Sequence, residues 1–320
     1  MPAGTVAEAI RVGTSGWNYP AGQGTWNGIF YPVPPGRRSR GAFDELRFYA
    51  EHFNTVEINS TFYGVPPAAT VRGWAERTPP GFEFSLKLYQ KFTHPGMFQK
   101  STGKDPWSLG QQDVDELLAS IDPLASAGKL GALLAQFPAS FRNEPDSRGY
   151  LAWLLQCFRD HRVAVELRHR SWSDEPAETL RLLDEFGAAW TQIDEPKFRF
   201  SIRQNLLPNV RTFYYLRLHG RNAAQWWAHG KSEDRYNYLY STEELRPFAE
   251  AAKEASREVK KAYLYANNHF SAKSVANAAI LKHDLGQSLP GEYPQAFVDR
   301  YPDLKGLVRV LPPPPSRKPS

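Results

Sequence analysis

Cysteine and methionine are scarce in this chain, and long apolar runs are missing. The single cysteine, Cys157, excludes an internal disulfide and fits a reducing compartment, so we expect a cytoplasmic location. No stretch approaches the ~18 apolar residues of a membrane helix. Residues 1–9 also lack the basic region and apolar run of a secretory signal, so no membrane partner is expected.

Sequence motifs of several enzyme classes are absent as well. Gly22 and Gly24 lack the G-x-G-x-x-G context, which argues against a dinucleotide site. No G-x-S-x-G elbow surrounds Ser15 or Ser60, which argues against a serine triad. No H-x-H or H-E-x-x-H spacing occurs, so we assign no metal ligand, although the Asp, Glu and His residues leave a divalent metal open as a cofactor.

The chain does contain a regular alternation of short apolar strands and amphipathic helices. Strands are predicted at residues 10–13, 55–59, 82–87, 131–137, 163–167, 188–193, 212–218 and 262–267. Helices are predicted at residues 43–53, 67–77, 112–127, 146–160, 176–186, 242–259 and 272–285. This alternation predicts a TIM (β/α)8 barrel in the α/β class, with a doubly wound sheet as the main competitor.

The expected barrel forms a single domain over residues 10–311, between an N-terminal extension at 1–9 and a Pro-rich tail at 312–320 that should be disordered. Connections from helix to strand are short, whereas several loops that leave strands are long. This asymmetry is expected when one end of a barrel carries a site. The segment 194–211 has no helical period and is left unassigned.

Nearly every predicted strand ends in a charged or polar side chain. These residues are Ser15, Trp17, Glu57, Asn59, Lys87, Gln136, Glu166, Arg168, Asp194, Arg217, His219, Asn267 and His269. Because the strand ends of a barrel meet around one axis, the set predicts a polar pocket at the C-terminal ends of the strands.

Glu57 and Glu166 are candidates for acid–base or nucleophilic chemistry, since glycoside-cleaving barrels use paired carboxylates. The alternative is structural: Glu57 would pair with Lys87, and Glu166 with Arg168 or Arg217. Lys87 could form a Schiff base, but beside two carboxylates we expect it to stay charged and bind an anion. The catalytic candidates are Glu57, Glu166, Lys87 and His219, the last as a proton shuttle or ligand.

Aromatic residues make up 13% of the chain, and the net charge is +5. Loop tryptophans such as Trp107 and Trp226 could stack on sugars or bases, or could simply pack the loops onto the rim. The positive charge weakly favours anionic ligands and leaves nucleic acid open as a partner. The substrate-binding candidates are Trp17, Asn59, Tyr63, Arg168, Trp172, Arg217, Asn267 and Asn268.

A series of motifs occurs in order along the chain: Gly13-Thr14-Ser15-Gly16-Trp17, Val56 to Tyr63, Thr78 to Phe84, Thr93-His94, Gln136-Phe137-Pro138, Val165 to His169, Leu216 to Gly220 and Asn267-Asn268-His269. Together they resemble the domain of unknown function 72 family, the YecE-like proteins, over roughly residues 10–285. The resemblance implies a TIM-type barrel and implies no activity. The matching strand-end residues are Glu57, Asn59, Lys87, Glu166, Arg168, His219 and Asn268.

We therefore expect an enzyme of the hydrolase or lyase type that acts on a small polar, anionic or sugar-containing substrate. The alternative is a non-catalytic protein that binds nucleic acid or a phosphorylated ligand. Salt separates the two, because a protein that follows a phosphate backbone loses affinity steeply as salt rises. The sequence predicts neither the substrate nor the oligomeric state.

Overall fold

The computed structural model describes residues 9–34, 43–105, 109–205, 212–226 and 233–311, and its main strands form two parallel sheets. The first has the order β1-β9-β8-β7 and consists of β1 (Ile10–Thr14), β9 (Ala262–Ala266), β8 (Tyr214–Leu218) and β7 (Gln192–Asp194). The second has the order β2-β3-β4-β5-β6 and consists of β2 (Thr55–Ile58), β3 (Glu83–Lys87), β4 (Leu130–Gln136), β5 (Val163–Glu166) and β6 (Ala189–Trp190). The predicted α/β class is confirmed.

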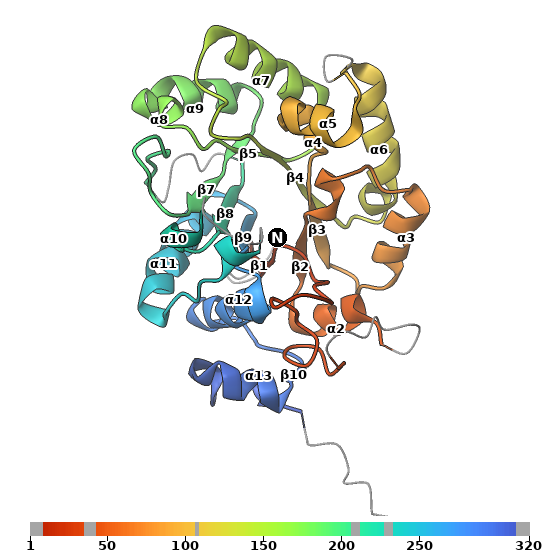
Figure 1. The fold of residues 1–320 in the computed structure, drawn as a ribbon, viewed down its shortest axis with the longest axis vertical. Coiled ribbons are helices and arrows are strands. Elements are labelled where there is room, and N and C mark those ends of the chain that lie inside the picture. The colour runs from red at the N-terminus through yellow and green to blue at the C-terminus, as the bar shows by residue number, and fades with distance from the viewer. Residues whose placement is uncertain (1–8, 35–42, 106–108, 206–211, 227–232, 312–320) are drawn as a thin grey trace, which may run out of the picture.

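The described residues include all seven predicted helices, each close to its expected position and packed around the strands (Figure 1). They are α2 (Glu45–His52), α3 (Ala68–Glu76), α6 (Gln111–Ser126), α7 (Pro145–Cys157), α9 (Pro176–Glu185), α11 (Thr242–Glu258) and α12 (Lys273–Asp284). The start of α11 shows why the prediction works. Ser241 Oγ accepts a hydrogen bond from Glu244 N (3.3 Å) while the Glu244 carboxylate accepts one from Ser241 N (3.0 Å), which is a capping box.

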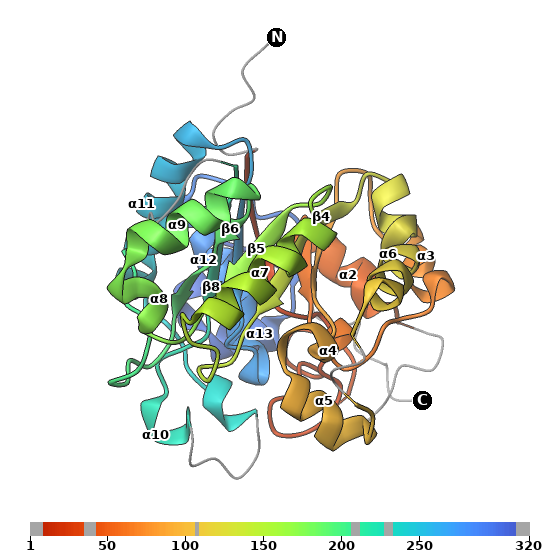
Figure 2. The same cartoon turned by 90° about the horizontal axis from the view of Figure 1, so that it is seen from above.

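Several short helices in the loops after strands were not predicted. They are α4 (Gln90–Thr93), α5 (Pro95–Thr102), α8 (Ser171–Asp174) and α10 (Ala223–Trp226), and Figure 2 shows α4, α5 and α10 toward one end of the molecule. Three of them have only four residues, too few turns for an apolar period to show in the sequence, and α5 buries only Phe98 of its eight residues. Within the described ranges, no helix combines the length and apolarity needed to cross a bilayer.

The two sheets share a buried interior. Parallel strands covered on both faces need near-continuous apolar sequence, and β4 is buried from its second residue onward. Alternate side chains on the strands pack against the helices in the large core. A second buried cluster draws on both sheets and consists of Ala132, Leu134, Ala164, Ala189, Phe213, Tyr215, Tyr263 and Tyr265.

The sheets meet where β1 lies beside β2. Ser15 and Glu57 form a parallel bridge there, and Gly16 N donates to Glu57 O at 2.7 Å. A Cβ atom on Gly13 would lie 2.2 Å from Thr55 O, so this close approach requires glycine.

The predicted strand 188–193 is corrected: it is divided into β6 and β7, each hydrogen-bonded in a different sheet. Thr191 N still donates to Val165 O (2.9 Å), on the side of the second sheet. Gln204 spans the break, because its Nε2 donates to Thr191 O (2.9 Å) and its Oε1 accepts from Ile193 N (3.3 Å). Gln204 belongs to the segment that the sequence left unassigned.

A C-terminal layer was also missed. It contains β10 (Glu292–Tyr293), α13 (Gln295–Arg300) and β11 (Arg309–Val310), which lie at the edge of the fold in Figure 1. Every residue of α12 from Ser274 to Lys282 is buried, as expected for a helix that is covered on all sides. The predicted tail at 312–320, most of the extension at 1–9, and Trp107 lie outside the described residues.

Candidate functional site

Four strands bring charged side chains together at one end of the fold. Glu57 lies on β2, Lys87 ends β3, Glu166 ends β5, and Arg217 lies on β8. Glu57, Glu166 and Arg217 are at most 2% exposed. Charges buried this deeply must be paired or hydrogen-bonded, so the contacts of each one decide what it can do.

Both carboxylate oxygens of Glu57 are engaged. Oε1 accepts from Ser15 Oγ (2.7 Å) and Arg217 Nη2 (2.7 Å), and Oε2 accepts from Tyr215 OH (2.7 Å) and Arg217 Nε (3.0 Å). This two-point contact with a guanidinium is the strong form of an ion pair. The expected pairing of Glu57 with Lys87 is wrong, because Arg217 occupies both oxygens.

Arg217 links the two glutamates. Its Nη1 donates to Glu166 Oε2 at 2.6 Å, while Nε and Nη2 face Glu57. Burial works to lower the pKa of Arg217, but the carboxylates of Glu57 and Glu166 outweigh it and raise the pKa. Arg217 is therefore a permanent cation between two anions.

Glu166 also pairs with Arg168, as the structural alternative predicted. Its Oε1 accepts from Arg168 Nε at 2.8 Å and lies 2.6 Å from Arg168 Nη2. Burial alone would raise the pKa of Glu166, but Arg217 and Arg168 hold it well below the usual range. Glu166 thus stays ionised and is poorly suited to donate a proton.

His219 lies behind this ion-pair network. Its Nδ1 is 2.8 Å from Asn267 Nδ2, and its Nε2 is 3.4 Å from Glu166 Oε1. Burial lowers the pKa of His219 to about 3, so the ring is neutral at neutral pH. Nε2 also lies 3.4 Å from Arg168 Nη2 and 3.5 Å from Arg217 Nη1, so the ring contacts Glu166 and both of its guanidinium partners.

Lys87 differs from the other charges. Its Nζ lies 3.9 Å from the centroid of the Phe62 ring, and no hydrogen bond or ion pair joins it to another residue in the described part of the chain. Burial, followed by repulsion from Arg217, lowers the pKa of Lys87 to about 7 despite Glu166 and Glu57. This lowered pKa argues against the expectation that Lys87 stays fully charged at neutral pH.

A polar cavity opens in front of these residues. Its outer part has a volume of about 670 Å³ and a deeper part adds about 200 Å³. Both parts are lined by Tyr19, Phe62, Tyr63, Lys87, Gln136, Arg168, Tyr236 and His269. The deeper part also reaches Asn59, Arg217 and Asn267, and Glu195 lies in the wall of the outer part.

The structure divides the predicted site residues into three groups. The residues that line the cavity are Asn59, Tyr63, Lys87, Arg168, Arg217 and Asn267. Glu57, Glu166 and His219 lie behind that lining and contact Arg217, Arg168 or Asn267. Tyr63 is at the rim, with 73% of its surface exposed.

Trp17, Trp172 and Asn268 form the third group, which packs loops. Trp17 meets Trp74 edge to face at 5.9 Å, and the buried Trp172 donates from Nε1 to Phe141 O at 2.9 Å. Asn268 Nδ2 donates to Tyr238 O at 2.8 Å. None of the three lines the cavity.

Sequence reasoning missed Glu195, Tyr19 and Tyr236. It named Asp194 instead of its neighbour, but Asp194 accepts hydrogen bonds from Arg221 Nε (2.8 Å) and Tyr240 OH (2.7 Å), and Glu195 lines the cavity. Successive side chains of an extended chain point in opposite directions, so alternation through 194 and 195 was the available signal. The break between β6 and β7 obscured it. Tyr19 stacks on His269 at 4.3 Å, and Tyr236 flanks the same ring at 4.8 Å.

Among the residues that the structure describes, no three Asp, Glu, His or Cys side chains form a group that could hold a metal ion. The acidic residues of the site bind guanidinium groups instead. The divalent metal that the sequence left open therefore has no ligand set in that part of the chain.

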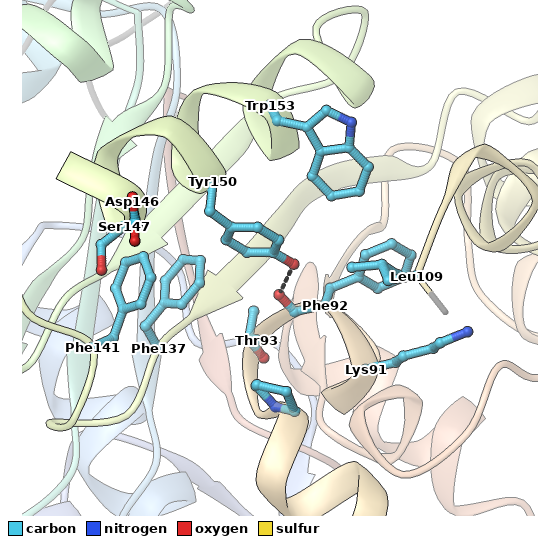
Figure 3. A pocket seen from close by; sticks show the side chains of 11 residues that line it. Lys91, Phe92, Thr93, Leu109, Phe137, Phe141, Asp146, Ser147, Tyr150 and Trp153 are labelled. Carbon is cyan, nitrogen blue, oxygen red and sulfur yellow. Dashed lines mark hydrogen bonds between the residues drawn. The ribbon is translucent and has the colours of Figure 1, made fainter. Parts of the chain in front are cut away.

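A second cavity, of about 440 Å³, lies between α4 and α7 and is mostly apolar (Figure 3). Phe92, Phe137, Phe141 and Trp153 contribute its aromatic lining. Tyr150 OH donates a hydrogen bond to Phe92 O (2.6 Å), drawn as a dashed line in Figure 3. Lys91 Nζ forms an ion pair with Asp113 at 2.6 Å. The polar cavity, which exposes an unpaired amine, is therefore the better candidate for chemistry.

Known proteins resemble this chain, some over most of its length and others over part of it. The family model described as "Protein of unknown function DUF72" matches residues 11–296. UPF0759 protein YunF of Bacillus subtilis is 28% identical over 275 residues, covering 84% of this chain and 92% of that protein. UPF0759 protein YecE of Escherichia coli is 32% identical over 126 residues, covering 39% of this chain and 41% of that protein.

Solved structures show the same relationship. A DUF72 family protein from Thermotoga maritima has a TM-score of 0.71 and 32% identity, covering 87% of this chain and 99% of that one. A DUF72 family protein from Enterococcus faecalis has a TM-score of 0.72 and 26% identity, covering 87% and 96%.

Proposed function

This chain belongs to the DUF72 family, whose name assigns no activity, and we propose from its site that it is an enzyme of the hydrolase or lyase type. The substrate is a small polar anion that binds in the polar cavity. The observation that carries the proposal is Lys87, whose amine lies in the cavity without an ion pair to a described residue, while the neighbouring Arg168 and Arg217 are paired with glutamates.

The scaffold of this proposal is a closed TIM barrel. With β6 and β7 counted as one interrupted strand, the two sheets supply eight parallel strands. The Ser15–Glu57 bridge joins the two sheets at one side. At the other side the chain passes through Thr191 from β6 in the second sheet to β7 in the first. The shared Tyr215–Tyr263–Tyr265 interior supports closure, since small barrels are filled by inward side chains.

Roles follow from access to the cavity. Lys87 and Arg168 bind the anionic group, and Asn59, Asn267 and Tyr63 orient the rest of the substrate. Glu57, Glu166 and His219 act through Arg217 and Arg168, which they hold in place. This moves the carboxylates from the acid–base role expected of them to a positioning role, because their oxygens are already occupied.

Thermal unfolding with added anions tests the proposal. Inorganic phosphate, gluconate and glucose 6-phosphate are added to the wild type, to Lys87→Met and to the exposed-lysine control Lys305→Met. A ligand at 100 times its Kd adds about 2.7 kcal/mol of stability, so at least one anion should raise the Tm of wild type and control by a few degrees, and that of Lys87→Met by much less. Equal shifts in all three proteins, or none in any, would refute the site.

The aromatic side chains that line the outer cavity favour one competing function, the binding of nucleic acid. The rings of Phe198 and Phe200 stack with their centroids 5.8 Å apart, and both line the outer cavity, as does the exposed Tyr63. Aromatic side chains of this kind can stack on bases. A nucleic-acid binder with 6–10 phosphate contacts loses about 10³–10⁵-fold in affinity between 50 and 200 mM salt. A few-fold loss for the stabilising anion, together with turnover of its esters or carbon–carbon bonds, supports the enzyme. A steep loss for a single-stranded oligonucleotide, without turnover, supports the binder.

A further inference from the structure

We infer that Lys87 is a nucleophile that forms an imine with the carbonyl carbon of a small oxo acid held in the polar cavity. The inference rests on the proposed function and narrows its substrate from any anion to one with a carbonyl group beside a carboxylate. The geometric basis is that Lys87 lines both parts of the cavity and that its Nζ has no hydrogen bond or ion pair with a described residue. A lysine can attack a carbonyl only when its amine is free and uncharged.

The surroundings of Lys87 keep the amine in that state. The face of Phe62 covers it at 3.9 Å and excludes water from one side. Arg217 on β8 and Arg168 after β5 repel a positive charge at Nζ. His94 adds no charge beside Lys87, because burial, followed by Lys87 itself, lowers its pKa to about 3 and leaves the ring neutral at pH 7.

The nearby carboxylates cannot restore the charge fully. Glu57 and Glu166 attract a proton to Lys87, but each is bound directly to guanidinium groups at 2.6–2.8 Å. The expectation that two carboxylates would keep this lysine charged therefore fails for a structural reason: the arginines take both. A Schiff-base lysine is often activated in this way, by desolvation next to another cation.

Arg168 provides the contact that orients an oxo acid. Its Nε and Nη2 face Glu166, whereas Nη1 has a longer 3.4 Å contact to Glu195 Oε2. The side chain is 19% exposed and lines both parts of the cavity. A substrate carboxylate on this Nη1 edge would keep the adjacent carbonyl within the small space that Lys87 also lines.

Glu195 provides the proton that imine formation needs. It is 5% exposed, lines the outer cavity, and its Oε2 accepts no hydrogen bond from a described residue. Burial raises its pKa, and Arg168 only partly opposes this. This raised pKa makes Glu195 a better general acid than an ordinary glutamate.

The step balances without any co-reactant. The Lys87 nitrogen forms a bond to the carbonyl carbon, and one amine proton passes to the former carbonyl oxygen, which gives a carbinolamine. Glu195 then donates its proton to the hydroxyl group, the carbon–oxygen bond breaks, and water leaves. The nitrogen loses its second proton to the Glu195 carboxylate, so the products are a neutral imine, one water molecule and the original acid.

Reductive trapping tests the inference. The full-length protein is incubated with pyruvate and sodium borohydride at pH 7, and the product is examined by intact mass and peptide mapping. We expect one reduced pyruvyl group per chain, located on Lys87, because an ordinary lysine has a pKa of about 10.4 and stays almost fully charged at this pH. Lys87→Met should lose the modification, and Lys305→Met should keep it.

The pH profile adds a readout that simple exposure would not produce. With a pKa of about 7, the uncharged fraction of Lys87, and with it the trapping rate, should rise about tenfold between pH 6 and pH 8. Glu195→Gln should slow trapping at least tenfold while pyruvate still raises the Tm. A label spread over many lysines, or a rate that keeps rising toward pH 10, overturns the inference.

The two experiments distinguish failure of the imine proposal from failure of the proposed anion-binding function. If Lys87 is not labelled but anions still stabilise the wild type more than Lys87→Met, the anion site stands and the imine is refuted. If neither labelling nor anion stabilisation is seen, both proposals fail. Peptide mapping of the wild type decides the question even if a variant does not fold.

Discussion

Arg217 holds the charged centre together at the scale of single residues. It is buried, yet its charge is compensated from two strands, by Glu57 on β2 and Glu166 at the end of β5. A buried ion pair contributes little net stability, but removing one partner leaves the other charge uncompensated. The centre is thus sensitive to small changes that a surface ion pair would tolerate.

Glu57→Gln should therefore destabilise the protein strongly although it keeps the shape of the side chain. Loss of one of two anions beside Arg217 is expected to cost about 3–5 kcal/mol in the free energy of unfolding. Urea denaturation measures it, with the exposed Glu258→Gln as the control. A change within 0.5 kcal/mol, typical of a surface site, would show that Arg217 does not depend on Glu57.

Single residues also show what sequence can and cannot predict. A carboxylate between Val56 and Ile58 is conspicuous in any buried strand, so Glu57 was predicted at the site. Its partner was not, because Arg217 lies 160 residues away and nothing local connects them. Lys87 was the near alternative on the next strand, and the choice between two cations depended on side-chain geometry that the sequence does not contain.

At the scale of elements, the junction of β1 and β2 decides whether two sheets become one structure. Gly13 allows the backbones to approach so closely that an added Cβ would meet Thr55 O at 2.2 Å. The bridge between Ser15 and Glu57 follows directly after this contact. The junction therefore also positions the Glu57 carboxylate.

Gly13→Ala should open this junction. Overpacking of this kind costs about 1–3 kcal/mol, and the Tm should fall accordingly. Gly149→Ala in α7 is the matched control, since no atom lies within 4 Å of its added Cβ and a helical alanine gains about 0.5–1 kcal/mol. Equal Tm values for the two variants would contradict the close approach.

The predictability of elements follows their length and regularity. The long helices repeat an apolar stripe over several turns, and α11 adds a capping box, so their positions could be predicted. The division into β6 and β7 could not, because it depends on Gln204, a side chain from a segment without any period, bonding to the strand backbone.

At the scale of the whole molecule, the C-terminal layer completes the core. The ring of Phe30, from the loop after β1, packs against the rings of Tyr293 and Phe297, with centroid distances of 6.2 Å and 5.6 Å. Tyr301 donates to the carbonyl of Ser271 beside α12. Sequence reasoning could not find this layer, because its short elements have no period and the burial of Tyr293 and Phe297 depends on Phe30, near the other end of the chain.

Deletion of residues 290–320 should prevent stable folding. It removes five large apolar side chains that are nearly fully buried: Tyr293, Phe297, Val298, Tyr301 and Leu304. At about 1.5–3 kcal/mol each, their loss is on the order of the total stability of a domain. Deletion of 312–320 removes none of them and should leave the Tm unchanged. A 290–320 deletion with a wild-type Tm would show that the layer is dispensable.

The tyrosines of the shared interior give the molecule a built-in optical signal. Burial, the largest cause for each, raises the pKa of Tyr215, Tyr263 and Tyr265 above the usual value, so none of the three can ionise while folded. In the unfolded chain these tyrosines ionise with a pKa of about 10. Their contribution to the free energy of unfolding is therefore fully present below about pH 10 and is lost as the pH rises above it. Their phenolate absorbance should therefore appear only as the protein unfolds in alkali, in a steep step whose sharpness reports how cooperatively the two sheets separate.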